Sequence, residues 1–597
     1  MKVHQSLGLL RRARVVASCF LLTASLAAAA QNLDQAAIEW LRKNAIPIQT
    51  VEAGHGFADL QALDKVVGDA RIVELGEATH GTREFFQLKH RMVEYLASRK
   101  GFTIFSIEAN MPEAYRLNDY VLNGNGDPKE LLKGMYFWTW NTQEVLDMVL
   151  WMREFNKSGK GRIEFTGFDM QTPTVAIDIV RKFASAHDPE FFSKTVDPLY
   201  AVVERMAKLP ERTFGVATTT LPIEALAGKH VTLSGYIKSE DLKDGWAGLW
   251  MRVDGEKGTP PLAFDNMEKR GVTGTTPWTR YEISMDVPAD AKAVVFGALQ
   301  TGSGTAWIDS LEITINGKPY KDVSHFDPGF ESATPRGFYT GGKGYDVSID
   351  STVAQSGKQS LRMKRISVPE VDAATIERNT DLAARIQKCS DVAGYLASNR
   401  DRYAQSGVTA RDLDWVVQNA RVVLQYVQMK AGIKTRDESM ADNIRWIADE
   451  NPGAKIVIWA HNDHVSNGGY AETAAMGSYL RKAYGEQLIN FGFAFNEGSF
   501  QAVEVGKGLH DFTVGPADEG TLDMTLAQVG IPVFAIDLRR VPRQGPVAEW
   551  FNQAHPSKSI GAVYSDATAM NYWTVSATDD FDVLLFVEKT TAAHPVQ

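Results

Sequence analysis

Hydrophobic and polar positions alternate in two different periods over the first third of the chain. Apolar runs with strand character cover residues 71–77, 102–108 and 162–169. Between and after them, apolar residues follow helical spacing over 82–99, 111–122 and 142–157. Strands of a parallel sheet are covered by helices on both faces, so they read as continuous apolar runs. This part of the sequence therefore predicts an α/β arrangement.

The same alternation returns near the end of the chain. We expect strands at 455–460, 487–495, 532–537 and 581–587, and a helix over 471–484. Residues 369–450 have the apolar spacing of three or four helices, one of them over 413–429. The two parts together predict an α/β fold with a mainly parallel sheet flanked by helices.

The segment between these parts has a different pattern. Residues 213–366 are rich in Gly and Thr and alternate apolar with polar positions, as in HVTLSGYI from residue 230. A period of two with frequent turn residues is typical of a β-sandwich. We therefore expect one α/β domain, formed by residues 31–212 and 367–597, that is interrupted by an inserted, jelly-roll-like β-sandwich at 213–366.

The first 30 residues have the features of a secretory signal peptide. Three arginines precede an apolar run over residues 15–26, and a run of alanines ends at Ala30. We expect cleavage after Ala30 and a periplasmic or secreted protein. Cleavage would change the formal net charge from −10 to −14, because residues 1–30 hold four basic residues and no acidic one. Cys389 would then be the single thiol, which excludes an intramolecular disulfide.

Composition narrows the classes of partner. The chain has 73 acidic and 63 basic side chains without a basic cluster, which argues against nucleic acid as a partner. After the predicted signal peptide, no apolar run approaches the length of a transmembrane segment. A hydrophobic content of 44% over 597 residues allows a large core and more than one domain.

Imidazole and carboxylate groups follow several of the predicted strands. The sequence GEATHG at 76–81 places Glu77 and His80 after one strand, and AHNDH at 460–464 places His461 and His464 after another. Glu108 ends a third apolar run. The carboxyl ends of parallel strands are where α/β sheets hold ligands, so we expect these side chains to converge. A carboxylate beside an imidazole orients the ring and raises its basicity, as general-base hydrolysis requires.

Other interpretations of these residues remain open. His80 could simply begin a helix, with Glu77 as a solvated acid. The histidines and carboxylates could also bind zinc or manganese, although HNDH lacks the His-Glu-x-x-His spacing. A serine or cysteine nucleophile is disfavoured, because the chain has no Gly-x-Ser-x-Gly sequence and Cys389 has no histidine nearby in sequence. Imidazole-activated water and a bound metal are the chemistries left.

Five motifs, taken in order, resemble those of the erythromycin esterase family. They are ELGEATHGTREFF at 74–86, SIEAN at 106–110, TGFDMQ at 166–171, RDESMADN at 436–443 and WAHNDH at 459–464. The resemblance runs over most of the chain outside residues 213–366. It implies an α/β fold with a helical lid, and hydrolysis of a carboxylic ester, in some members a macrolide lactone, without a metal cofactor.

The resemblance also implies catalytic roles. His80 is expected to be the base that activates water, while Glu77 and Glu108 orient it or the water. His461 and His464 are expected to stabilise the oxyanion or to protonate the leaving alcohol.

Substrate-binding candidates come from the same motifs. Lys89 or Arg91 corresponds to an arginine that characterised members carry on the first helix. Lys89 would offer a point charge and not a bidentate clamp. Asp169, Arg436 and Asp437 are further candidates, although Arg436 and Asp437 could equally form an ordinary helix cap and ion pair.

The predicted sandwich adds a possible second partner. It resembles carbohydrate-binding jelly rolls whose first and last parts are exchanged in order, so the strand at 359–364 should pair with strands of 215–315. Trp246, Trp250 and Tyr339 could stack on sugar rings or fill the core. The leading interpretation is thus an exported esterase acting on a small ester or lactone. The alternatives are a metal-dependent hydrolase with the same Glu and His cluster, and a non-catalytic glycan-binding envelope protein.

Overall fold

The computed structural model of the 597-residue chain describes residues 33–208, 214–255, 262–366, 382–468, 474–504, 508–564 and 572–596, apart from 322, 324, 325 and 343. The predicted signal peptide lies outside these residues, so its cleavage and the periplasmic or secreted location stay predictions. Among the described helices, none has the length and hydropathy to cross a membrane.

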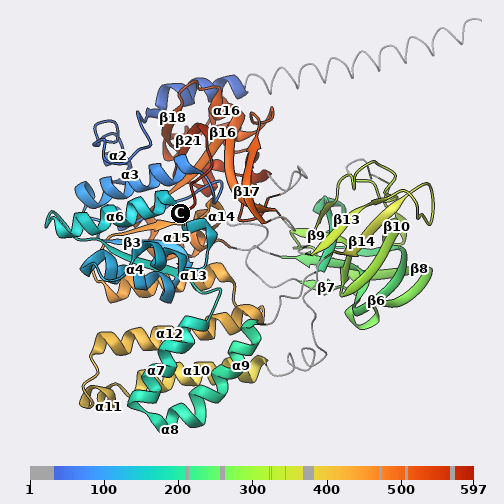
Figure 1. The fold of residues 1–597 in the computed structure, drawn as a ribbon. Coiled ribbons are helices and arrows are strands. Elements are labelled where there is room, and N and C mark those ends of the chain that lie inside the picture. Colours follow the sequence, from blue (N-terminus) through green and yellow to red (C-terminus); the bar gives the residue numbers. More distant parts are fainter. Residues whose placement is uncertain are drawn as a thin grey trace, which may run out of the picture.

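A nine-stranded mixed sheet forms the centre of the larger part of the molecule (Figure 1). Its strands run in the order β1 (Ile46–Pro47), β18 (Val533–Asp537), β21 (Val583–Thr590), β16 (Leu488–Glu504), β2 (Ile72–Leu75), β15 (Ile456–Trp459), β3 (Ile104–Asn110) and β4 (Glu164–Asp169), and β17 (Gly508–Val514) pairs with β16. The pairings from β21 through β4 are parallel. Those of β1, β18 and β17 are antiparallel, which the apolar pattern did not indicate.

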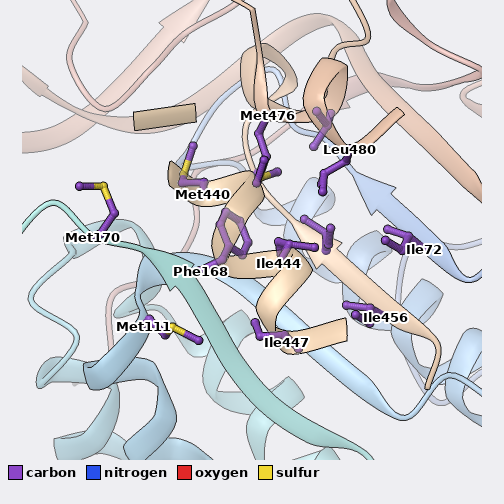
Figure 2. Close-up of a cluster of buried hydrophobic side chains, with 14 of the residues drawn as sticks. Ile72, Met111, Phe168, Met170, Met440, Ile444, Ile447, Ile456, Met476 and Leu480 are labelled. Atoms are coloured by element: carbon purple, nitrogen blue, oxygen red, sulfur yellow. The ribbon is translucent and has the colours of Figure 1, made fainter. Parts of the chain in front are cut away.

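Helices cover both faces of this sheet. Successive residues of a strand point to opposite faces, so neighbours in sequence pack in different hydrophobic clusters. Val73 and Leu75 of β2 belong to a hydrophobic cluster with residues of α3 (Arg83–Lys100), α4 (Met111–Asn123) and α6 (Gln143–Lys157). Ile72 belongs to a second cluster, with residues of α13 (Arg436–Glu450) and α15 (Met476–Tyr484). Figure 2 shows this second cluster around α13. The predicted α/β arrangement is thereby confirmed.

A further group of helices lies at one end of the larger part, at the bottom of Figure 1. It contains α7 (Thr174–His187), α9 (Asp197–Lys208), α10 (Leu382–Ser398), α11 (Arg400–Gln405) and α12 (Ala410–Lys430). Residues of α7, α9, α10 and α12 pack in the second hydrophobic cluster. That these helices act as a lid stays a prediction. Shorter helices are α2 (Leu63–Val67), α5 (Pro128–Lys133), α8 (Pro189–Phe191), α14 (Asn462–Val465), α16 (Leu522–Ala527), α17 (Pro546–Phe551) and α18 (Ala577–Asp580).

The region predicted as a sandwich forms a second sheet of ten strands, all paired antiparallel. The strands are β5 (Phe214–Leu221), β6 (His230–Asp254), β7 (Ala263–Asp265), β8 (Val272–Asp286), β9 (Ala293–Thr301), β10 (Ser303–Ile315), β11 (Lys318–Pro319), β12 (Tyr339–Gly341), β13 (Tyr345–Asp350) and β14 (Ser360–Arg365). A smaller sheet pairs β19 (His555–Lys558) with β20 (Tyr572–Val575).

This second sheet has a hydrophobic core of its own and stands beside the larger part in Figure 1. The long strand β6 pairs with β8, β9 and β10, so the strands form one continuously bonded sheet. β14 pairs with β10, which is the pairing expected for residues 359–364. Trp246 and Trp250 are half-buried, whereas Tyr339 is 41% exposed. The two-layered, jelly-roll-like form and the domain boundaries stay predictions.

Candidate active site

The carboxyl ends of four neighbouring strands carry the candidate residues. In the order β2, β15, β3 and β4, the candidate side chains at or near these ends are those of Glu77, His461, Glu108 and Asp169. His461 is the N-cap residue of α14, directly after β15. Because the strands are parallel and adjacent, residues from distant parts of the sequence meet at one edge of the sheet.

The loop after β2 has no room for a side chain at its two glycines. A Cβ atom at Gly76 would lie 2.3 Å from Asn462 Oδ1, and one at Gly81 would lie 2.2 Å from the carbonyl oxygen of Gln501. Close approach of neighbouring segments, rather than a left-handed backbone, therefore requires glycine in GEATHG. This packing holds His80 between the other strand ends.

Glu77 is completely buried, and three side chains hold its carboxylate. Lys89 Nζ and Trp459 Nε1 donate to Oε2 over 2.7 and 2.9 Å, and His80 Nδ1 lies 2.7 Å from Oε1. Burial raises the pKa of Glu77, but Lys89 and His80 outweigh burial and leave the pKa below its usual value. Burial lowers the pKa of Lys89 to about 8, against the opposing effect of Glu77. Glu77 is therefore an ionised group that orients His80.

His80 keeps one ring nitrogen available. Its Nδ1 faces Glu77, and none of the described residues is within hydrogen-bond distance of its Nε2. The ring lies edge-on to Trp140, with 6.0 Å between centroids, and 4.8 Å from the ring of His461. The side chain is 11% exposed. When Nδ1–H is donated to a carboxylate, the ring lone pair is on Nε2, the position required of a base.

Arg436, the first residue of α13, joins the ends of β3 and β4. Its Nε and Nη2 donate to the two carboxylate oxygens of Asp169 over 3.1 and 2.8 Å, and Nη2 also donates to Glu108 over 2.7 Å. The other oxygen of Glu108 accepts the backbone N–H of His461 over 2.9 Å. Burial acts to raise the pKa of Glu108, but His464 and Arg436 hold it well below its usual range. This forked pairing fixes the guanidinium in one orientation.

His464 lies between Asp437 and Arg436. Its Nδ1 is 2.7 Å from Asp437 Oδ1, and its Nε2 is 2.9 Å from Arg436 Nη1 and 3.4 Å from Glu108 Oε1. Burial acts to lower the pKa of His464, but Asp437 and Glu108 raise it to about 10. The Arg436 donor beside Nε2 favours a neutral ring. The single guanidinium of Arg436 is outnumbered by three carboxylates, those of Asp169, Glu108 and Asp437. This excess of negative charge favours a protonated, charged His464.

His461 has both ring nitrogens engaged. Nδ1 is 3.1 Å from Asp463 Oδ2, and Nε2 is 3.2 Å from the carbonyl oxygen of Ile560. Burial acts to lower its pKa, but Asp463, Glu77 and Glu108 outweigh burial and raise the pKa. His461 is thus a fixed imidazole beside His80 and not a second base of the same kind.

The donor arrangement does not suit a divalent metal. Among the described residues, no three His, Cys, Asp or Glu side chains are placed to hold a metal ion. Nδ1 of His80 and of His464 faces a carboxylate, and Nε2 of His464 faces a guanidinium. A metal needs those nitrogen lone pairs, and its charge would be opposed by Lys89 and Arg436.

The substrate-binding candidates differ in what they can reach. Lys89 and Asp169 are completely buried beneath Glu77 and Arg436, so neither offers an atom to a substrate in this structure. Arg91, the alternative to Lys89, pairs with Asp59.

Asp437 binds His464 and the N–H of Met476. Arg436 keeps 24% of its side chain exposed and is the cation that a ligand can approach.

Three residues that hold the site residues in place were not among the candidates named from the sequence. Trp459 donates to Glu77, Trp140 Nε1 donates to the carbonyl oxygen of Glu108 over 2.9 Å, and Asp463 pairs with His461. Asp463 lies inside the HNDH motif, where its carboxylate was a visible signal. Trp459 looked like an ordinary apolar strand residue, and nothing in the local sequence marks Trp140.

A family model and a curated relative identify the family of this chain. The model of the erythromycin esterase family matches residues 97–231 and 353–590 and therefore more than half of the chain, although it begins after His80. A 135-residue segment is 33% identical to erythromycin esterase type II of Escherichia coli and covers 22% of this chain and 31% of that protein. A 152-residue segment is 31% identical to a putative hydrolase of Bacillus subtilis and covers 25% of this chain and 33% of that protein. The aligned segments thus span about a third of each relative.

Solved structures support the fold. A Bacillus cereus protein matches with a TM-score of 0.59 and 18% identity, covering 94% of this chain and 99% of that one. A structure described as a succinoglycan biosynthesis protein matches with a TM-score of 0.56 and 19% identity, with the same coverage of both chains. At these identities the likeness concerns the fold alone.

Proposed function

The chain belongs to the erythromycin esterase family, and on that premise we propose that it is an exported hydrolase that cleaves a carboxylic ester or macrolactone with water activated by His80. The observation that carries the proposal is the His80–Glu77 pair. Nδ1 of His80 is 2.7 Å from an ionised, buried carboxylate, and Nε2 has no partner among the described residues. That combination is what a general base requires.

In the proposed reaction, His80 Nε2 accepts a proton from water as the water oxygen bonds to the ester carbonyl carbon. Glu77 stabilises the resulting imidazolium, and Lys89 and Trp459 keep the carboxylate in place. The tetrahedral intermediate then expels the alkoxide, which takes the proton from His80. The products are a carboxylic acid and an alcohol.

The positive groups at the ends of β3 and β4 are proposed to stabilise the oxyanion of this intermediate. Arg436 is partly exposed and held rigidly by Asp169 and Glu108, and His464 carries a raised pKa beside it. Donors fixed before the reaction stabilise developing charge at no cost of reorganisation. Arg436 is accordingly proposed as the oxyanion and substrate contact, and His461 as the neighbour that positions His80 and Glu108.

Carbohydrate recognition by the ten-stranded sheet stays a secondary proposal. Tyr339 is 41% exposed and can offer its ring to a sugar, whereas Trp246 and Trp250 are half-buried. Loss of polysaccharide retention in Tyr339→Ala, with retention unchanged in Trp246→Phe, would support it.

The test of the proposed function uses mass spectrometry. The full chain without residues 1–30 is incubated with a panel of macrolides and acylated sugars, and products that have gained one water are counted. We expect wild type to hydrolyse at least one compound and His80→Ala to fail on it. His55→Ala is the matched control, because His55 is largely exposed and pairs with Glu52. Equal hydrolysis by His80→Ala, or product formation that stops on chelation, would overturn the mechanism.

A further inference from the structure

A cavity beside β4, the edge strand of the nine-stranded sheet, is lined by none of the candidate active-site residues. It has a volume of about 310 Å³ and is lined by residues of β4, α4, α12 and α13. Glu164, the first residue of β4, lines this cavity, whereas Asp169, the last residue, binds Arg436. The volume falls at the lower end of small-molecule sites, which hold compact ligands.

Three aromatic side chains line one part of the cavity. Tyr115 of α4 stacks on Trp415 of α12, with 4.3 Å between centroids and 29° between planes. Trp446 of α13 follows at 6.2 Å from Trp415. All three side chains are only half-buried. Trp415 and Trp446 pack in part against the second hydrophobic cluster, and both also line the cavity.

Three carboxylates also line the cavity. Glu164, Asp414 and Glu450 line the cavity together with one cation, Arg411. Arg162 binds Glu164 over 2.9 Å, and Arg400 pairs with Asp414. Arg411 lies 4.0 Å from Glu164 and contacts the Tyr115 hydroxyl over 3.4 Å. Glu450 is the lining carboxylate that makes no ion pair with a described residue, although Arg400 and Arg421 lie near enough to influence it.

The helix that carries Glu450 adds to the negative potential. Ile447, Glu450 and Asn451 belong to the carboxyl-terminal end of α13, which has no basic residue in its last turn. The carboxyl end of a helix carries a partial negative charge that favours cations. Burial and Asp414 raise the pKa of Glu450, whereas Arg400 and Arg421 lower it. The amino end of α12 acts in the opposite direction, but Asp412 and Asp414 offset it.

We propose that this cavity binds a small organic cation of the quaternary ammonium class, held between the rings of Trp415, Trp446 and Tyr115 and the carboxylate of Glu450. The ring faces attract the cation through their quadrupoles, most strongly for tryptophan. Glu450 supplies the balancing charge. A neutral ligand of the same shape would lose the attraction of Glu450 and of the ring faces. The site is separate from the proposed hydrolysis and adds a binding activity to it.

The experiment compares choline with 3,3-dimethylbutan-1-ol, which has the same shape without the charge. Binding to the full chain is measured by calorimetric titration and by saturation-transfer NMR on the methyl groups. We expect choline to bind at a single site and the neutral alcohol to bind at least about tenfold more weakly. Choline and alcohol binding equally, or choline failing to bind, would overturn the proposal.

Two variants and two matched controls locate the binding. Trp415→Leu and Glu450→Gln should each weaken choline binding by about fivefold to tenfold. Trp151→Leu removes a half-buried tryptophan of α6, and Glu154→Gln removes a carboxylate from the last turn of α6 that is 68% exposed. Neither control should change binding. Because Glu450 is exposed, its variant keeps the fold, which the circular dichroism spectrum checks. Unchanged affinity in both Trp415→Leu and Glu450→Gln would place choline elsewhere and refute the assignment.

Discussion

The His80 half and the His464 half of the site each combine an imidazole, a carboxylate and a basic side chain, but they differ in charge and in the freedom of the imidazole. In the first half, Glu77 alone faces His80, and tryptophan rings surround the pair. In the second, three carboxylates surround Arg436 and His464. His80 keeps Nε2 without a partner among the described residues, whereas both nitrogens of His464 are engaged. A proton acceptor needs an unengaged nitrogen, and a group that stabilises charge needs a fixed position.

Removing the imidazole of the first half should have the largest effect. We expect His80→Ala to lower kcat/KM by about 10²- to 10⁴-fold on the substrate found in the panel, the usual contribution of a general base. Initial rates at saturating and limiting substrate provide the measurement. His55→Ala should leave the rates unchanged. A His80→Ala variant with most of the wild-type rate would assign the base to the second half.

Breaking the buried ion pair of the first half should cost stability as well as rate. Glu77→Gln leaves the ammonium of Lys89 buried without its carboxylate, so we expect the free energy of unfolding to fall by about 3–5 kcal/mol in urea titrations. The double variant Glu77→Gln/Lys89→Met should recover most of that stability but none of the activity. If the double variant is active, Glu77 serves only to neutralise Lys89.

Loosening the second half should have a smaller effect on rate. Arg436→Lys keeps the charge but cannot make the forked contact to Asp169 and Glu108, and we expect kcat/KM to fall by about tenfold to a hundredfold. The control is Arg445→Lys on the same helix, whose side chain is 40% exposed. If kcat/KM falls only because KM rises, with kcat unchanged, Arg436 binds the ground state and not the oxyanion.

The most gradual effect concerns the pH dependence of stability in the second half. The pKa of His464 is raised from its ordinary 6.5 to about 10, so its stabilising effect is complete below pH 6.5 and is lost as pH rises toward 10. We expect the difference in unfolding free energy between wild type and His464→Asn to shrink by about 1 kcal/mol per pH unit across that window. Urea titrations at several pH values provide the measurement. A difference that is constant with pH would mean that His464 is neutral.

Much of the larger sheet could be predicted from periodicity. The runs at 71–77, 102–108 and 455–460 correspond to β2, β3 and β15, because strands buried on both faces must be apolar throughout. The edge strand β1 could not be predicted, since Ile46–Pro47 is two residues long and contains a proline. β16 extends to Glu504, beyond the predicted end at 495, because β17 pairs with its second half.

The site could be predicted as a set of residues more fully than as a set of contacts. Strand ends marked Glu77, Glu108 and His461, because a charged group directly after an apolar run has no packing role. Sequence does not show which carboxylate faces which cation. Lys89 was therefore expected beside a substrate, whereas its position on the sheet-facing side of α3 places it under Glu77. Trp459 was missed because it ends a continuous apolar run and therefore looks like a core residue. The hydrogen bond from its indole N–H to Glu77 depends on the tertiary fold.

The strand order has a consequence for how the chain is made. β15 lies between β2 and β3 in the sheet, yet it follows them by more than 300 residues in sequence. Arg436 is 267 positions after Asp169, so on the ribosome it appears roughly 15–50 s later at the usual rates of synthesis. During that interval β3 can pair with β4, but the strand that joins β2 to β3 is missing, and Glu108 and Asp169 lack the guanidinium of Arg436. The newly made first third should therefore have an incomplete sheet, and limited proteolysis of chains stalled before residue 436 would reveal it as protease-sensitive.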